Sequence, residues 1–513
     1  MPTNTDLSSP VSLNVLSRSI EIHKISSFPN NLEHYHSYDT NRRRSIDISR
    51  LNNRSPELQT ESGIAHIGCG NFHRSHQEYY LNQLLKANYE ENKNWLYTGI
   101  GVLPNDIKLK DKLKKNNFKY HIISLNNEGK AEIEHINTLK NVLVTCENTE
   151  SCIDTLINPA IKIVSLTITE YGYSIPLNDK DIELIHNTLE INDYSENDDL
   201  EMDMDADTDN DNDNDNAKLN TCDEKDTSQN ISAFGLIIAA LAFRYKNNIR
   251  PFTIMSCDNL ISNGDICKNK CMEELSKIND ECFKIWMMEE VKYPNTMVDR
   301  ITPFINEQEI IDLEKKYTII DSSPVVCENY KSWIIEDNFV DNCRPKWENV
   351  GTIMTDNVKP YEYMKLCLLN IPHSFVAYCG LVKDYVYVHE VMQDPELVVK
   401  VKKFITEDII PVIEKEIDIC EIDYVQYSED VLKRFSNEHM KDKLTRIAQD
   451  GMDKFKNQGL PILLKGIKMN LKMLNFRTYI ENWFNYEKIS YGDPILNTVE
   501  SWVDTWFKDN EKK

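Results

Sequence analysis

Short apolar runs and amphipathic segments alternate through the first two thirds of the chain. Continuous apolar runs predict buried strands at 64–67, 95–102, 120–125, 161–169 and 252–255. Between them, apolar side chains recur at helical spacing in 77–86 and 234–245, which predicts helices there. Strands that alternate with helices form parallel sheets with both faces covered. The pattern therefore predicts an α/β fold.

The pattern changes near residue 355 and is helical almost throughout the rest of the chain. Helices are expected at 396–404, 409–416 and 441–455. We therefore predict three parts: a polar N-terminal extension over 1–62, an α/β domain over 63–354, and a mostly α-helical domain over 355–513.

One segment distorts the formal net charge of −25. Residues 193–226 hold 15 acidic side chains against Lys218 and Lys225, so about half of the net charge lies there. Such a segment cannot bury enough apolar surface to offset its conformational entropy, and we predict a disordered surface insertion. An EF-hand calcium site is disfavoured because the central glycine and the later glutamate of that loop are missing.

Composition excludes several classes of protein. No apolar run approaches the roughly 18 residues of a membrane span, and the polar start lacks the basic and apolar regions of a secretory signal. The 13 cysteines are odd in number and scattered, which is typical of reduced thiols, so we expect a cytoplasmic protein. The cluster Arg42-Arg43-Arg44 is too short to indicate nucleic acid in an acidic chain. No metal, nucleic-acid or membrane partner is expected.

The first predicted strand leads into the turn Gly68-Cys-Gly70-Asn-Phe72-His73 and then a helical pattern. Glycines at such a turn let the backbone approach a pyrophosphate, and the next helix offers its N–H groups to the anion. Only two of the three fingerprint glycines are present, since His73 takes the third place. Asp106, after the second strand, is the candidate for the adenosine ribose, although it lies farther along the chain than the usual ~20 residues.

The run from Tyr361 to His373 places one lysine, one asparagine and one histidine among apolar residues. At about 100° per residue, Asn370 lies about 140° and His373 about 80° from Lys365, so all three can face one cavity. A lysine that only extends from a helix surface is the alternative.

Two further polar residues, Asn259 and Glu170, follow apolar strands. Ligands of parallel sheets bind outside the carboxyl ends of the strands, so Asn259 is well placed to meet a substrate. A turn or capping role is the commoner explanation of such an asparagine. Glu170 could relay protons or only pair with a cation.

Five ordered motifs carry a family resemblance. They are the GxGxFHR turn at 68–74, Leu166-Thr-Ile-Thr-Glu170, Met255-Ser-Cys-Asp-Asn-Leu260, the segment Pro294–Pro303, and the run with Lys365, Asn370 and His373. Together they resemble the polyol-specific long-chain dehydrogenase/reductase family over about residues 63–506. The resemblance implies a Rossmann-type N-terminal domain, a helical C-terminal domain, and NAD and substrate bound between them without metal, in a protein expected to be a monomer.

The resemblance also implies a role for each matching residue. Lys365 would be the catalytic base, Asn259 and Asn370 the oxyanion donors, and His373 the residue that orients the substrate. Glu170 would relay protons. Asp299, Arg446 and Lys454 would contact the substrate, and Gly68, Gly70, Phe72 and Asp106 would bind the cofactor.

The chemistry of alcohol oxidation agrees with these roles. The hydroxyl proton must leave as hydride leaves carbon, so the base must be neutral, and a desolvated lysine has a lowered pKa. Amide donors can stabilise the negative charge that grows on the oxygen without titrating themselves. We expect interconversion of a polyol and a ketose, with D-mannitol and D-fructose as the first choice.

Departures from the family leave alternatives open. Ile371-Pro372 stands where the family usually has Gly-Ser, and a proline would kink a helix beside His373. Asn105 replaces one of two acids thought to select NAD over NADP. Pro372 and a short C-terminus would suit a catalytically impaired scaffold.

Two other enzymes fit parts of the pattern. A hexuronate reductase would use Arg446 and Lys454 to pair with a carboxylate. Tyr361-x-x-x-Lys365 also fits the catalytic pair of short-chain dehydrogenases, but that pair normally lies in the same domain as the dinucleotide turn, and here it follows far downstream.

Overall fold

A computed structural model describes residues 62–190, 230–416 and 423–487 of the protein. The predicted N-terminal extension up to residue 61, the acidic insertion at 193–226 and the residues after 487 lie outside these ranges. Within the described ranges, no helix combines the length and the apolar character that crossing a bilayer would require.

A five-stranded parallel sheet forms the centre of the α/β part. Its strands are β1 (Ser62–Ile67), β2 (Leu96–Gly101), β5 (Leu139–Val144), β6 (Ile163–Leu166) and β7 (Thr253–Ser256), in the order β5-β2-β1-β6-β7. The register aligns Ile67 with Ile100 on one side and with Leu166 on the other. The chain continues from β1 to β2 on one side and places β6 and β7 on the other side. The carboxyl ends of the strands beside β1 therefore form a topological switch point, where doubly wound folds bind ligands.

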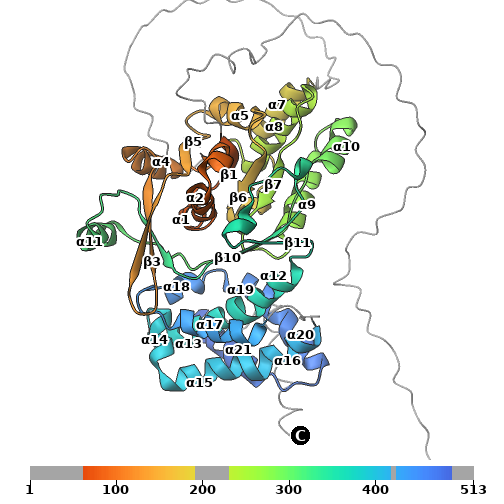
Figure 1. Ribbon diagram of the computed structural model, residues 1–513. Coiled ribbons are helices and arrows are strands. Elements are labelled where there is room, and N and C mark those ends of the chain that lie inside the picture. The colour runs from red at the N-terminus through yellow and green to blue at the C-terminus, as the bar shows by residue number, and fades with distance from the viewer. Residues whose placement is uncertain (1–61, 191–229, 417–422, 488–513) are drawn as a thin grey trace, which may run out of the picture. The chain divides into compact units, whose positions relative to one another are not determined.

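Helices cover both faces of this sheet (Figure 1). The helices of the α/β part are α1 (Asn71–Ser75), α2 (Gln77–Ala87), α3 (Tyr89–Asn92), α4 (Asp106–Lys115), α5 (Thr149–Ile157), α6 (Thr169–Ser174), α7 (Asp179–Leu189), α8 (Ala233–Lys246), α9 (Asn263–Leu275), α10 (Glu281–Glu290) and α11 (Glu307–Tyr317). Side chains alternate along β1: Ile64 joins the core that includes Leu81 of α2, whereas Ala65 joins the core that includes Leu156 of α5 and Leu241 of α8. Burial on both faces explains why the strands read as continuous apolar runs.

One predicted strand belongs to a different sheet. β3 (Tyr120–Leu125) has the predicted bounds, but it pairs antiparallel with β4 (Ala131–Ile136) and parallel with β9 (Val325–Glu328), outside the central sheet. A third sheet contains β8 (Thr296–Asp299), β10 (Ser332–Glu336) and β11 (Ile353–Thr355). Apolar patterning identifies a strand but not its partners, so the assignment of β3 to the parallel sheet was wrong.

The helical part begins at Lys359 and packs around one apolar core that includes Phe375, Phe404 and Phe476. Its helices are α12 (Lys359–Lys365), α13 (Ile371–Leu381), α14 (Val388–Gln393), α15 (Pro395–Lys403), α16 (Ile410–Glu416), α17 (Tyr424–Phe435), α18 (Leu444–Ile447), α19 (Gly451–Lys454), α20 (Leu460–Lys468) and α21 (Leu474–Glu487). The expected fold class, a Rossmann-type domain with a mostly helical domain after it, is confirmed.

Three π-helical turns join helices of this part, and each precedes a helix with proline at its second residue. They are η7 (Leu366–Asn370) before Pro372, η8 (Phe404–Ile409) before Pro411, and η9 (Phe455–Gly459) before Pro461. In η7 the N–H of Ile371 donates to the carbonyl of Leu366, five residues back. Proline lacks an N–H and its ring clashes with the carbonyl four residues earlier, which a wider turn relieves.

Pro372 therefore leaves the helical segment uninterrupted. Asn370 and Ile371 keep helical dihedral angles, and α12, η7 and α13 follow one another without a gap. The predicted helix at 441–455 is wrong for a different reason. Asp450 has a left-handed φ of 57°, and the Asp-Gly pair separates α18 from α19.

Candidate active site

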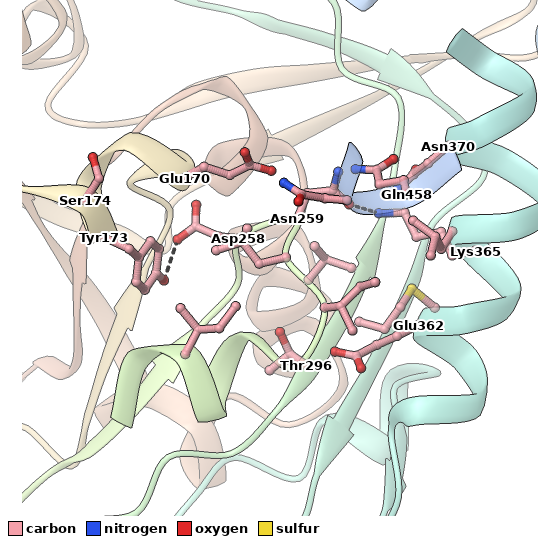
Figure 2. A pocket seen from close by; sticks show the side chains of 17 residues that line it. Glu170, Tyr173, Ser174, Asp258, Asn259, Thr296, Glu362, Lys365, Asn370 and Gln458 are labelled. Carbon is pink, nitrogen blue, oxygen red and sulfur yellow. Dashed lines mark hydrogen bonds between the residues drawn. The ribbon is translucent and has the colours of Figure 1, made fainter. Parts of the chain in front are cut away.

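A cavity of about 470 Å³ lies at the carboxyl ends of β6 and β7, against α12 (Figure 2). Loops after these strands, strand β8, and the turns η7 and η9 supply its walls. Its lining comprises Glu170, Tyr173, Ser174, Asp258, Asn259, Leu260, Ile261, Ile266, Thr296, Met297, Val298, Glu362, Lys365, Leu366, Asn370, Asn457 and Gln458. The α/β part and the helical part thus both contribute to this cavity.

Lys365 is the last residue of α12 and is only 9% exposed. Its Nζ donates a hydrogen bond to Oδ1 of Asn259, drawn as a dashed line in Figure 2. Burial has the largest effect on the pKa of Lys365 and lowers it. Of the neighbouring charges, Asp299 raises this pKa, Arg434 lowers it, and Glu362 has the smallest effect and raises it. A buried amine with a lowered pKa has the property that a neutral base requires.

Asn259 and Asn370 meet at this lysine from different parts of the chain. Asn259 follows β7, and Asn370 closes η7. In a regular α-helix Asn370 would lie about 140° around the axis from Lys365. The π turn puts one more residue into the turn and so brings the two side chains toward one face. Figure 2 shows both asparagine amides beside Lys365. We call Asn259, Lys365 and Asn370 the cavity cluster.

Three acidic side chains line the same cavity. Burial raises the pKa of Glu362 to about 7 and that of Asp258 to about 6. Asp258 accepts hydrogen bonds from Tyr173 Oη at 2.8 Å and from the backbone N–H of Thr169. Glu170, in the first turn of α6 rather than at a strand end, has its pKa raised by burial first, lowered by Lys454, and raised by Asp450 and Asp453. Every acid of the lining is thus shifted toward its neutral form.

Sequence reasoning missed seven polar residues of the lining, namely Tyr173, Ser174, Asp258, Thr296, Glu362, Asn457 and Gln458. Glu362 could have been found, because it precedes Lys365 by three residues and so shares its helical face. Asp258 directly precedes Asn259. No comparable signal marks Gln458, because the wide turn η9 sets its direction.

His373 does not line the cavity, so the expectation that it shares one face with Lys365 and Asn370 was wrong. Its Nε2 lies 3.6 Å from Oδ2 of Asp442, and its ring stacks on Phe435. Arg446 donates to both carboxylate oxygens of Asp442 at 2.7 Å. Burial lowers the pKa of His373 to about 4, an effect that the Asp442 carboxylate opposes. We call His373, Asp442 and Arg446 the Asp442 cluster.

Two other residues with expected substrate contacts are also engaged with protein groups. Lys454 donates to the backbone carbonyls of Ile447 and Gln449 at 2.9 and 2.6 Å. Asp299, at the end of β8, accepts two hydrogen bonds from Arg434 and one from Tyr427. Neither side chain lines the cavity.

The glycine turn after β1 has the geometry of an anion-binding loop. Gly68 has φ of 92°, and a Cβ there would lie 2.1 Å from the carbonyl oxygen of Thr167, so only glycine fits. A Cβ at Gly70 would meet only one atom, 4.0 Å away, which leaves its outer side open to a close approach. Phe72, in α1, stacks on His76. These features suit a bound pyrophosphate.

Asp106 follows β2, the neighbour of β1 in the sheet. It is the first residue of α4, and its Oδ2 accepts a hydrogen bond from the backbone N–H of Leu103 at 2.9 Å. The helices α1, α2 and α3 lie between Gly70 and β2, which explains the long spacing from the glycine turn. Burial raises the pKa of Asp106, an effect that hydrogen bonds from Leu103 and Val102 oppose.

His73, at the third fingerprint position, belongs to a buried polar group under the turn. Its ring stacks on His66 with centroids 3.4 Å apart, and its Nε2 lies 3.0 Å from Glu78 Oε1. Cys69, His73 and Glu78 offer ligand atoms within 4.8 Å of one another, the one such group of three among the residues that the structure describes. His73 and Glu78 already pair, and burial raises the pKa of the Cys69 thiol, so we interpret the group as a packed polar core rather than a metal site.

Tyr361 packs against an apolar cluster of Met297, Ile334 and Val358 and does not line the cavity. A catalytic tyrosine must reach the reacting oxygen, so this packing disfavours the short-chain dehydrogenase alternative.

Comparison with known proteins identifies both parts of the chain. The profile of the mannitol dehydrogenase Rossmann domain matches residues 62–349, and that of the mannitol dehydrogenase C-terminal domain matches residues 357–496. A mannitol dehydrogenase of Saccharomyces cerevisiae is 32% identical over 457 residues, which cover 87% of this chain and 83% of the relative.

Solved structures give the same result. The mannitol 2-dehydrogenase of Pseudomonas fluorescens, in a ternary complex with NAD and D-mannitol, aligns with a TM-score of 0.68 and 31% identity over 88% of this chain and 86% of that one. A substrate-free D-sorbitol dehydrogenase aligns with a TM-score of 0.66 and 27% identity, covering 82% and 80% of the two chains. Both domains and their order thus agree, and the chain belongs to the mannitol dehydrogenase family.

Proposed function

We propose that the protein is an NAD-dependent polyol dehydrogenase that interconverts D-mannitol and D-fructose, with Lys365 as the base. The observation that carries the proposal is the buried amine of Lys365, which is hydrogen-bonded to Asn259 in a cavity that Asn370 also lines. NAD and D-mannitol are the ligands of the aligned Pseudomonas fluorescens enzyme. The cofactor supplies the hydride acceptor, and the protein positions the reacting carbon.

Proton removal falls to Lys365. Its Nζ already donates to Asn259 Oδ1, so the lone pair of the neutral amine can accept the proton of a substrate hydroxyl in the cavity. Because Oδ1 of Asn259 accepts from lysine, its Nδ2 group is left as a donor to the substrate oxygen. Asn370 supplies a second amide donor, so the growing negative charge would meet two groups that stay neutral.

The dinucleotide would bind along the carboxyl edge of the central sheet. Gly68, Gly70 and Phe72 form the turn that would hold the pyrophosphate, and Asp106 at the end of the neighbouring strand would accept hydrogen bonds from the adenosine ribose. Glu170 at the cavity wall would pass protons toward solvent, since it is the exposed acid of the lining.

The charge of the cavity favours a neutral polyol over a sugar acid. Among the described residues of the lining, Lys365 is the one cation, and as a base it must be neutral when substrate binds. Arg446 is held by Asp442, and Lys454 by backbone carbonyls. A hexuronate carboxylate would therefore enter a cavity with three acids and no free cation in its lining, which is an unfavourable environment.

A substrate panel tests the proposal. D-mannitol, D-sorbitol, xylitol and D-mannonate are each supplied with NAD or NADP, and reduced nicotinamide is followed by absorbance. We expect the highest kcat/KM with D-mannitol and NAD. A preference for D-mannonate would support the hexuronate alternative, and no turnover of any compound would support a catalytically impaired scaffold.

A further inference from the structure

Arg434, a residue with no role in the proposed reaction, connects the helical part to two strand ends of the α/β part. It lies on α17 and is 8% exposed. Its Nη1 and Nη2 donate to the two oxygens of Asp299 at 2.9 and 2.7 Å, and its Nε and Nη2 donate to the two oxygens of Glu328 at 2.9 and 2.8 Å. One guanidinium therefore engages all four oxygens of two buried carboxylates.

Neighbouring aromatic residues hold this group in place. The guanidinium carbon lies 4.0 Å from the ring centroid of Tyr330, in cation–π geometry. Tyr427, two helical turns before Arg434 on the same face of α17, donates its hydroxyl to Asp299 Oδ2 at 3.0 Å. Both oxygens of Asp299 are thus occupied from α17.

Net stability is a weak explanation for such a group. Removing two carboxylates and a guanidinium from water costs several kcal/mol per ion, and buried ion pairs often contribute nothing beyond well-packed apolar side chains. A positional role explains the geometry better, because Asp299, one of the two residues that Arg434 holds, acts electrostatically on Lys365.

Asp299 and Arg434 act on Lys365 in opposite directions. The Asp299 carboxylate raises the pKa of Lys365 and the Arg434 guanidinium lowers it. Glu362, on the same helix as Lys365, also raises the pKa of Lys365. Lys365 in turn lowers the pKa of the buried His76, which lies between α1 and α2. Lys365 nevertheless donates to Asn259 and not to Asp299. A buried carboxylate without another partner would be the stronger acceptor for this amine.

We propose that Arg434 is a positioning residue for the base: by occupying Asp299, it keeps the amine of Lys365 on Asn259 and directed into the cavity. The inference rests on the proposed function of Lys365. Without Arg434, Asp299 would keep the Tyr427 hydroxyl as a donor but no counter-charge, and it would attract the lysine as an ammonium ion. Less neutral amine would then be present at a given pH, and alcohol oxidation would require a higher pH.

The variant Arg434→Gln tests this inference. We expect kcat/KM for polyol oxidation to fall about tenfold near neutral pH, as for a base whose pKa has risen by one unit, and to recover as the pH is raised. Adding Asp299→Asn should move the pH profile back toward that of the native protein, because the competing carboxylate is then neutral. If Arg434→Gln does not fold, Arg434→Lys keeps one charge but cannot bridge four oxygens, and should give a smaller shift of the same sign.

Arg344→Gln is the matched control. Arg344 also joins two carboxylates, Asp337 and Glu348. The charges that shift the pKa of Lys365 are instead Asp299, Arg434 and Glu362. We expect it to leave the pH profile unchanged.

A direct titration separates failure of this inference from failure of the proposed function. NMR of protein labelled with ¹³C at lysine Cε, assigned with Lys365→Ala, follows the protonation of Lys365 whether or not a polyol is turned over. An upward shift of this titration in Arg434→Gln supports the inference. A lysine titration and a pH profile that coincide with those of the native protein would overturn it, even if kcat were lower.

Discussion

The cavity cluster and the Asp442 cluster each contain a long basic side chain but differ in the group that accepts its hydrogen bonds. In the cavity cluster, the amine of Lys365 meets the amide oxygen of Asn259. In the Asp442 cluster, the guanidinium of Arg446 meets both oxygens of a buried carboxylate. The neutral amide supplies no negative charge that would hold a proton on the lysine, whereas the carboxylate supplies the arginine with a counter-charge. A polar group in an active site thus acquires its chemistry from its partner as much as from its own type.

Lys365→Ala should break the cavity cluster with the largest effect. We expect kcat for polyol oxidation to fall by roughly 10²–10⁴-fold, the usual contribution of a general base. NADH binding, followed by fluorescence, should change little. Lys400→Ala is the control, because Lys400 is an exposed lysine paired with Glu396 on its own helix. Turnover in Lys365→Ala close to that of the control would exclude Lys365 as the base.

Asn370→Ala should have the next largest effect. Loss of one oxyanion donor typically lowers kcat by roughly 10²–10³-fold, and KM should change less because the donor acts mainly in the transition state. Steady-state kinetics with D-mannitol measure both constants. An increase in KM at constant kcat would instead assign Asn370 to ground-state binding.

Asp442→Asn should sharpen the comparison by making the Asp442 cluster resemble the cavity cluster. An amide cannot neutralise Arg446, so the guanidinium becomes available to an anion. We expect kcat/KM for D-mannonate relative to D-mannitol to rise about tenfold, which corresponds to ~1.4 kcal/mol. If this ratio does not change, Arg446 plays no part in substrate selection.

His373→Asn tests the Asp442 cluster through the stability of the protein at acid pH and not through catalysis. The pKa of His373 is lowered to about 4, so between this value and the ordinary value near 6.5 the unfolded chain binds a proton that the folded protein excludes. Its contribution to stability is therefore present above about pH 6.5 and is lost as the pH falls toward 4, by up to about 3 kcal/mol. The variant should flatten the dependence of Tm on pH across this interval, as measured by calorimetry. An unchanged slope would mean that His373 is not buried in neutral form.

The strands of the α/β part could be predicted closely because sheets covered on both faces leave continuous apolar runs. The runs at 64–67, 120–125 and 252–255 agree with β1, β3 and β7 to within two residues. The partners of β3 could not be predicted, since its pairing with β9 joins segments about 200 residues apart. The π turns and the break at Asp450 were missed because helical periodicity assumes a uniform turn.

The candidate site could be predicted where a motif put polar residues into an apolar run. Asn259, Lys365, Asn370 and Glu170 all line the cavity. Arg434 was missed because it occupies one position in an ordinary amphipathic helix, and only the folded chain brings it to Asp299. The partner of Arg446 was also missed, although Asp442 precedes it by only four residues in the sequence.

The turn η7 determines which mutations between Lys365 and Asn370 the protein can tolerate. A π turn contains one residue more than the α-helical turn that it replaces. Deletion of a single apolar residue such as Leu368 would leave both polar clusters complete in composition, yet it would rotate α13 by about 100° relative to α12. Lys365 and Asn370 would then no longer face one cavity. Substitutions within 366–369 are therefore expected to be tolerated far better than insertions or deletions, and the count of residues between the lysine and the asparagine is itself a determinant of activity.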